Sequence, residues 1–104
     1  MQKLALIIKT TCRPGKRDEV HALWEKELRP RAESNSGQEV YFFCNDDQND
    51  NVFYLFELYS DGDLFQKQAQ EKWFWAYMQK VAPLLDGEPE VAITTPIWAK
   101  GAAL

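Results

Sequence analysis

The chain has 104 residues, of which 45% are hydrophobic and 27% are charged, and its formal net charge is −4. A chain of this length fits one globular domain with one core, so we expect a single domain over residues 1–104. Nucleic acid is not expected as a partner, because the lysines and arginines are scattered rather than clustered on a basic surface. No apolar run approaches the roughly 20 residues of a membrane span, so no membrane contact and a cytoplasmic location are expected.

Three residues with reactive side chains are interpreted as structural. Cys12 and Cys44 fall in separate strand-like segments without CxxC spacing or a histidine cluster, which predicts free thiols rather than a metal site or a redox pair. The only histidine, His21, lies at the border of a helical apolar stripe, and a solvent-facing position is expected for it.

Alternating and helical apolar patterns predict four strands and two helices in the order βαββαβ. The expected strands are 3–11, 38–44, 52–59 and 91–99, the last interrupted by Pro96, and the expected helices are 16–33 and 61–85. Pro30 is expected to loosen the last turn of the first helix. This order predicts an α+β fold of the ferredoxin-like type, with one antiparallel sheet and two helices on one face.

The second helical segment contains a change of direction. At about 100° per residue, its early apolar positions face one way and its later ones another, which predicts a break near residues 70–72 and two pieces, 61–70 and 73–85. Trp75 is expected to face away from the sheet. Trp73 is expected at the edge, where it can close a pocket or meet a partner subunit. The residues expected to lie on the sheet are Phe74, Tyr77, Met78 and Val81.

The strand 52–59 (VFYLFELY) is largely apolar on both faces. A sheet covered by helices on one side only should alternate apolar with polar residues, so the second face is expected to meet another sheet. In one small domain that sheet must come from a second copy. The pattern therefore predicts a homodimer whose two sheets pack together.

Several loose motifs, spread over nearly the whole chain, resemble the antibiotic biosynthesis monooxygenase (ABM) family. They are Pro14-Gly15-Lys16 before the first helix, Gly37 with Tyr41 in the second strand, and Glu57-Leu58-Tyr59 followed by Ser60 and a helix with Trp73-Phe74. The resemblance implies a dimeric α/β-barrel fold. It also implies either monooxygenation of phenols and quinols without a cofactor or, as in other relatives, haem degradation.

The chain departs from the family pattern at three positions. Tyr59 stands where the family often has a tryptophan, and Gln68 and Trp73 stand where it often has histidines. Since the haem-degrading relatives use a histidine of this helix as iron ligand, haem binding in that mode is not expected here. No metal or flavin is expected either.

Oxygenation without a cofactor needs a site that eases deprotonation, excludes water and holds a flat apolar substrate. The candidate catalytic residues are Gln68, Tyr59 and Glu27, and the candidate substrate-binding residues are Trp73, Tyr77, Trp24 and Phe65. Alternatives remain open for the first three: Gln68 can reach water, Tyr59 can serve packing, and Glu27 can form an ordinary surface pair with Arg31.

The predicted function is that of a cofactor-independent monooxygenase acting on an aromatic, phenolic or quinol-type small molecule, in a pocket between the helices and the sheet. The alternative is a binding or sensing module of the same fold that has lost the catalytic residues. Retained ligand affinity without turnover would favour the alternative.

Overall fold

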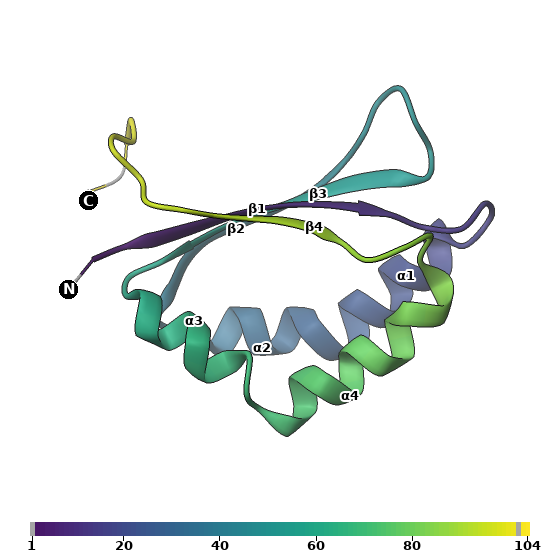
Figure 1. Cartoon of the computed structure of the whole chain (residues 1–104), viewed down its shortest axis with the longest axis horizontal. Coiled ribbons are helices and arrows are strands. Elements are labelled where there is room, and N and C mark those ends of the chain that lie inside the picture. The colour runs from purple at the N-terminus through teal and green to yellow at the C-terminus, as the bar shows by residue number, and fades with distance from the viewer. Residues whose placement is uncertain (1, 102) are drawn as a thin grey trace.

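The computed structural model describes residues 2–101 and 103–104. They form a four-stranded antiparallel sheet in the order β2-β3-β1-β4, and the helices lie together on one of its faces (Figure 1). The strands are β1 (Leu4–Thr11), β2 (Gln38–Asn45), β3 (Val52–Tyr59) and β4 (Glu90–Thr94). The predicted order βαββαβ and the ferredoxin-like class are confirmed.

The first helical segment is continuous but changes its winding. It consists of α1 (Arg17–Leu23), the π-helical turn η1 (Trp24–Leu28) and α2 (Arg29–Ser34). The N–H of Arg29 bonds the carbonyl of Trp24, five residues back. Pro30 has no N–H, and its ring would clash with the carbonyl four residues earlier in an α-helix, a conflict that a wider turn relieves. The loosening was predicted in the last turn of the helix, whereas the widened turn is Trp24–Leu28, before Pro30.

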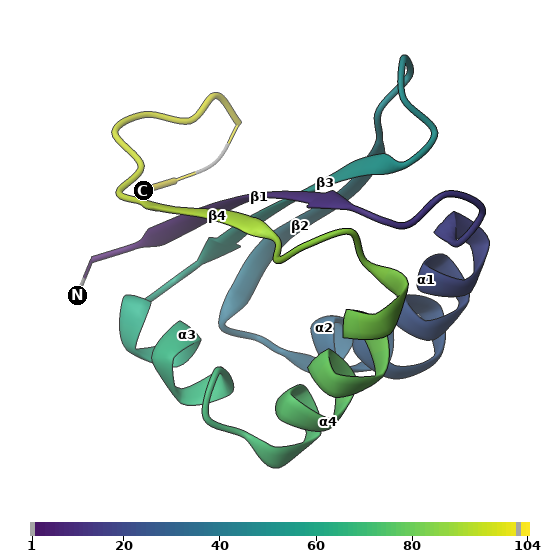
Figure 2. The same cartoon turned by 45° about the vertical axis from the view of Figure 1, so that its right-hand side comes forward.

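The second helical segment is broken in two, as predicted. α3 (Gly62–Gln68) and α4 (Lys72–Val81) are followed by the 3₁₀ turn η2 (Ala82–Leu84), and Figure 2 shows α3 and α4 running in different directions. Asp61 caps α3, because its Oδ1 accepts a hydrogen bond from the N–H of Asp63 across 3.0 Å. Trp75 faces solvent with 59% of its surface exposed, which confirms its predicted direction.

The fourth strand is shorter than predicted. It ends at Thr94, and the expected extension to residue 99 is wrong. Proline has no N–H to donate to a neighbouring strand, and it restricts the backbone conformation of the residue before it. Pro96 therefore prevents β4 from continuing, rather than interrupting a longer strand. The segment after β4 lies on the side of the sheet opposite the helices (Figures 1 and 2).

The tightly packed core occupies one end of the space between helices and sheet. Its buried members are Cys12, Val20, Phe53, Tyr77, Val81 and Leu85. Both cysteines are free, as predicted. His21 does not face solvent as expected: its ring packs edge-on against Phe43 at a centroid distance of 4.9 Å, and its Nε2 is buried without a hydrogen-bond partner.

The face of the sheet turned away from the helices is apolar and open. Along β3, alternate residues face the helices or this outer face, and on the outer face Phe56 is 41% exposed. Its neighbour on β2, Phe42, is 58% exposed. Ile7 and Tyr54 are exposed beside them. We call Ile7, Phe42, Tyr54 and Phe56 the outer apolar face. The prediction that β3 is apolar on both faces is confirmed.

In the part of the chain that the structure describes, no helix is long and apolar enough to cross a membrane.

Candidate functional site

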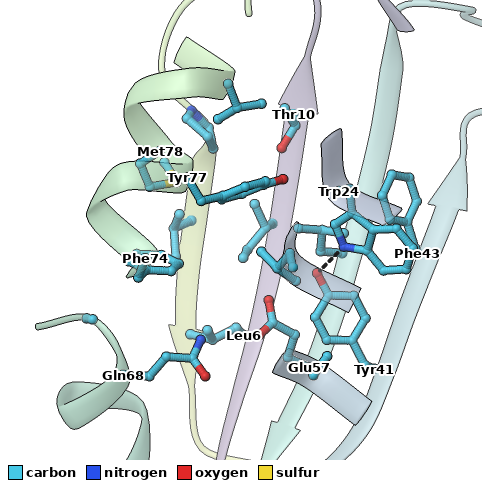
Figure 3. A pocket seen from close by; sticks show the side chains of 18 of the residues that line it. Leu6, Thr10, Trp24, Tyr41, Phe43, Glu57, Gln68, Phe74, Tyr77 and Met78 are labelled. Atoms are coloured by element: carbon cyan, nitrogen blue, oxygen red, sulfur yellow. Dashed lines mark hydrogen bonds between the residues drawn. The ribbon is translucent and has the colours of Figure 1, made fainter. Parts of the chain in front are cut away.

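A cavity of about 180 Å³ lies between the sheet and the helices. We call it the inner cavity. Its walls are mostly aliphatic and aromatic side chains: Leu6, Ile8, Phe53 and Leu55 come from the sheet, and Phe65, Phe74 and Met78 come from α3 and α4. Figure 3 shows these two sides facing each other across the space. An apolar cavity with a few polar groups is the usual form of a small-molecule site.

A hydrogen-bonded cluster of three polar side chains lies on the strand side of the inner cavity. Gln38 Nε2 donates to Glu57 Oε1 across 2.8 Å and lies 3.1 Å from the hydroxyl of Tyr59. The Tyr59 hydroxyl in turn donates to Glu57 Oε1 across 3.0 Å. The other oxygen of Glu57 makes no hydrogen bond to any residue that the structure describes, so it is free to meet a ligand.

Glu57 is a carboxylic acid in an apolar environment. Only 6% of its surface is exposed. Burial raises the pKa of Glu57 above its usual value, because a low-dielectric environment disfavours the charged form, while the hydrogen bonds from Tyr59 and Gln38 act in the opposite direction. A carboxyl group with a raised pKa at the wall of a cavity is a stronger base than an exposed carboxylate and is a candidate for proton transfer.

Two phenols that line the inner cavity, Tyr41 and Tyr77, remain neutral at ordinary pH. Trp24 Nε1 donates a hydrogen bond to the hydroxyl of Tyr41 across 3.0 Å (Figure 3). Burial is the main reason that the pKa values of Tyr41 and Tyr77 lie well above that of a free tyrosine. Both hydroxyls therefore keep their protons and can donate hydrogen bonds to a ligand.

Gln68 lies on the opposite side of the cavity from Glu57, and Figure 3 shows the two polar groups pointing into the space from α3 and β3. Gln68 Oε1 accepts a hydrogen bond from Asn35 Nδ2 across 3.0 Å. That bond fixes the orientation of the amide, and its NH₂ group meets the Tyr59 hydroxyl, where a hydrogen bond from Gln68 acts to lower the pKa of Tyr59. The NH₂ group has a second N–H. It can donate to a ligand oxygen.

The structure brings six of the seven predicted site residues to the inner cavity. They are Gln68, Tyr59, Trp73, Tyr77, Trp24 and Phe65. Tyr59 is fully buried and its hydroxyl is hydrogen-bonded to Glu57, so the hydroxyl is not exposed to solvent. Their roles toward a substrate stay predictions.

Glu27 lies elsewhere. Its carboxylate accepts a hydrogen bond from Lys80 Nζ across 2.9 Å, and it is not part of the cavity wall. The predicted direction of Glu27 was counted at the pitch of a regular α-helix, whereas this residue belongs to the π-helical turn η1, where that count fails. The expected alternative partner, Arg31, instead places its guanidinium over the ring of Trp73, 4.8 Å from the centroid.

Three polar residues of the site were missing from the sequence-based candidates: Glu57, Gln38 and Tyr41. A signal for Glu57 was present. It is the only charged residue of β3, and alternation places it on the same face as Phe53, Leu55 and Tyr59. For Gln38 and Tyr41 the signal is weaker, because only their register opposite β3 brings them to Glu57.

A second, more polar cavity of about 220 Å³ adjoins the first. We call it the outer cavity. It lies between the end of α2, helix α3 and the start of α4, and its polar wall includes Arg31, Asn35, Lys67 and Glu71. Gln68 and Trp73 belong to the walls of both cavities.

Among residues 2–101 and 103–104, no group of three or more His, Cys, Asp or Glu side chains is placed to hold a metal ion.

No protein-family model matches the sequence, and a search of curated proteins also finds no match. Solved structures do match. A candidate antibiotic biosynthesis monooxygenase from Caulobacter crescentus superposes with a TM-score of 0.85 at 16% identity, over 93% of this chain and 92% of that one. A mutant of SnoaB, a cofactor-independent oxygenase from Streptomyces nogalater, gives a TM-score of 0.83 at 12% identity, over 98% and 100%.

A protein of unknown function from Nitrosomonas europaea is also similar, with a TM-score of 0.80 at 25% identity over 99% of this chain and 97% of that one. The resemblance predicted from the sequence is thus confirmed at the level of the fold: the chain has the fold of the antibiotic biosynthesis monooxygenase proteins.

Proposed function

We propose that this protein is a cofactor-independent monooxygenase that oxidises a phenolic or quinol-type small molecule in the inner cavity. The observation that carries the proposal is Glu57, a buried carboxyl group with one free oxygen, at the wall of an otherwise aromatic and aliphatic cavity. The fold of a protein named as a cofactor-independent oxygenase supports it.

Each polar group has a role in this reaction. Glu57 acts as the base that takes the proton from a substrate hydroxyl, and Tyr59 and Gln38 stabilise the carboxylate through their hydrogen bonds. Gln68 orients a substrate oxygen from the opposite side. The aromatic side chains of Trp24, Phe65, Trp73 and Tyr77 hold the flat ring and keep water away from it.

The chemistry balances without an external reductant. The substrate anion passes an electron to dioxygen, the two radicals combine into a peroxide on the ring carbon, and the O–O bond then breaks. One oxygen atom stays on the ring and the other leaves as water. The substrate supplies all of the electrons, so that a hydroquinone becomes a hydroxyquinone.

The active form is proposed to be a homodimer. The outer apolar face consists of large side chains such as Phe42 and Phe56, whose ring centroids lie 6.4 Å apart. Exposed contiguous apolar surface on a small protein marks an interaction site. A second copy that packs its own outer apolar face against this one would remove these side chains from water.

The test is oxygen uptake and product analysis under air with a panel of hydroquinones and anthrones. The wild-type protein is expected to consume oxygen with at least one of them. Glu57→Gln is expected to lower the rate by about 10²-fold or more, because a positioned base contributes about 10²–10⁴-fold. The control Glu88→Gln, an exposed carboxylate outside both cavities, should keep full activity.

Two outcomes would contradict the proposal. No oxygen uptake with any of these compounds would remove the enzymatic assignment, and affinity without turnover would support the binding or sensing module instead. Full activity of Glu57→Gln would remove Glu57 from the reaction.

A further inference from the structure

We infer that the substrate is a phenolic acid with a single ring: the ring occupies the inner cavity and a carboxylate on a short side chain lies in the outer cavity, beside Arg31 and Lys67. This inference rests on the proposed function of the inner cavity and adds the substrate class to it. Four observations support it, namely the size of the inner cavity, the two wall residues that it shares with the outer one, and the charge and the geometry of the outer wall.

The inner cavity limits the number of rings. Its volume is about 180 Å³. An apolar protein cavity of about 150 Å³ is known to accept benzene. A single hydroxylated ring therefore fills most of the inner cavity, and a fused three-ring compound such as anthrone does not fit without displacing the side chains of its walls.

The two cavities share part of their walls. Gln68 and Trp73 each contribute to both walls, Gln68 from α3 and Trp73 from the first turn of α4. In the inferred pose, a substituent on a ring in the inner cavity passes between these two side chains into the outer cavity. This boundary lies at the break between α3 and α4, where the chain leaves the helical path.

The outer wall is positively charged overall. Arg31 and Lys67 take part in none of the ion pairs found among the described residues. The one carboxylate of this wall, Glu71, accepts a hydrogen bond from Trp73 Nε1 at Oε2, so the wall carries two cations against one carboxylate. Two cations without ion-pair partners on a chain of net charge −4 create a local site for an anion.

The geometry of Arg31 suits a carboxylate. Its guanidinium lies over the Trp73 ring, 4.8 Å from the centroid. A guanidinium without an ion-pair partner keeps its N–H groups for a ligand, and these match a carboxylate in pairs. The same indole thus forms a wall for the ring and holds the cation that binds the acid.

The experiment compares three ligands by calorimetry under argon, so that binding is measured without turnover. They are 2,5-dihydroxyphenylacetate, its methyl ester, and unsubstituted hydroquinone. The acid is expected to bind about tenfold more tightly than the ester, a modest preference because exposed charges are partly screened. Raising the salt concentration should reduce that preference.

The variant Arg31→Gln/Lys67→Gln is expected to lose the preference for the acid while its affinity for hydroquinone stays unchanged. Lys26→Gln/Lys100→Gln is the matched control, since it removes two exposed cations that line neither cavity. It should retain the preference. Arg31→Lys, which keeps the charge but loses the planar group, should retain part of it.

The outcomes separate this inference from the proposed function. Equal affinity for the acid and the ester, or a preference that survives in Arg31→Gln/Lys67→Gln, overturns the inference even if hydroquinones are oxidised. A preference for the acid without oxygen uptake in air overturns the oxygenase proposal and leaves the ligand class standing. Absence of binding by all three compounds overturns both.

Discussion

Tyr59 donates a hydrogen bond from its hydroxyl to Glu57 Oε1 across 3.0 Å, and both side chains are buried on the strand side of the inner cavity. They lie two residues apart on β3, so alternation places them on the same face. Burial raises the pKa of Glu57, whereas the hydrogen bond from Tyr59 favours the charged carboxylate and acts to lower it.

Glu57→Gln is expected to change how stability depends on pH. Because the folded-state pKa of Glu57 is raised, the native protein binds this proton more tightly than the unfolded chain does. That contribution to stability is present below the unfolded pKa, which is about 4.3, and is lost as the pH rises through the folded value. Glutamine keeps the shape and cannot ionise.

The measurement is the melting temperature of both proteins at a series of pH values from about pH 4 upward, since the contribution of Glu57 changes above its unfolded pKa. The melting temperature of Glu57→Gln relative to the wild type is expected to increase as the pH rises. If the difference stays constant or decreases with pH, Glu57 does not carry a raised pKa in the folded protein.

Tyr59→Phe is expected to move the pH profile of the reaction. The lost hydrogen bond stabilised the carboxylate, so the pKa of Glu57 should rise further, and the basic form needed for catalysis should appear at higher pH. The acidic limb of the kcat/KM profile is expected to shift upward. Tyr54→Phe removes a hydroxyl bonded to Asp46 across 3.1 Å but keeps the ring that belongs to the outer apolar face, so it should leave the profile in place. An unchanged profile in Tyr59→Phe would contradict this role.

The sequence predicted the fold more completely than the chemistry. Apolar periodicity identified β3 and the break between α3 and α4, because each depends on the direction of side chains within one segment. The surroundings of Glu57 could be recognised only in part, because alternation placed it on the inner face of β3 but did not show its hydrogen-bond partner on β2. Its partner Gln38 lies on another strand, so the cluster appears only once β2 and β3 are in register.

Glu27 shows the limit of counting angles along a helix. Its predicted position on the apolar stripe assumes regular winding, whereas the π-helical turn before Pro30 alters that winding and directs Glu27 to Lys80. The presence of Pro30 indicated a distortion, but not on which side of the proline it would lie.

Gln68→Leu is expected to weaken substrate orientation while preserving the fold. The change removes the amide that lines both cavities, together with its hydrogen bond to Asn35. Asn35 stays in place because its Oδ1 still accepts a hydrogen bond from the N–H of Gly37. We expect Gln68→Leu to lower kcat/KM by roughly fivefold, because one lost hydrogen bond destabilises the transition state by about 1 kcal/mol.

Kinetics and thermal melting check this prediction together. Gln66→Leu, on the exposed side of the same helix, is the matched control and should leave kcat/KM unchanged. A Gln68→Leu protein as active as the wild type would show that its amide does not contact the substrate.

Phe56→Glu is expected to dissociate the proposed dimer. Phe56 is 41% exposed at the centre of the outer apolar face, next to Phe42, and two glutamates brought together there would lack partners. Sedimentation at micromolar concentration should give a dimer for the wild type and a folded monomer for the variant. Trp75→Glu changes an exposed aromatic on the helical side and should remain dimeric. A folded wild-type monomer would contradict the proposed assembly.

The most direct test of monooxygenation is a reaction with 2,5-dihydroxyphenylacetate and hydroquinone under ¹⁸O-labelled dioxygen, using protein treated with a chelator. Mass spectrometry is expected to find one labelled oxygen atom in the hydroxyquinone and the other in water. Glu57→Gln is expected to form much less labelled hydroxyquinone than the wild type. A product that carries no label, or quinone formed with hydrogen peroxide as the reduced species, would contradict oxygen transfer by this protein.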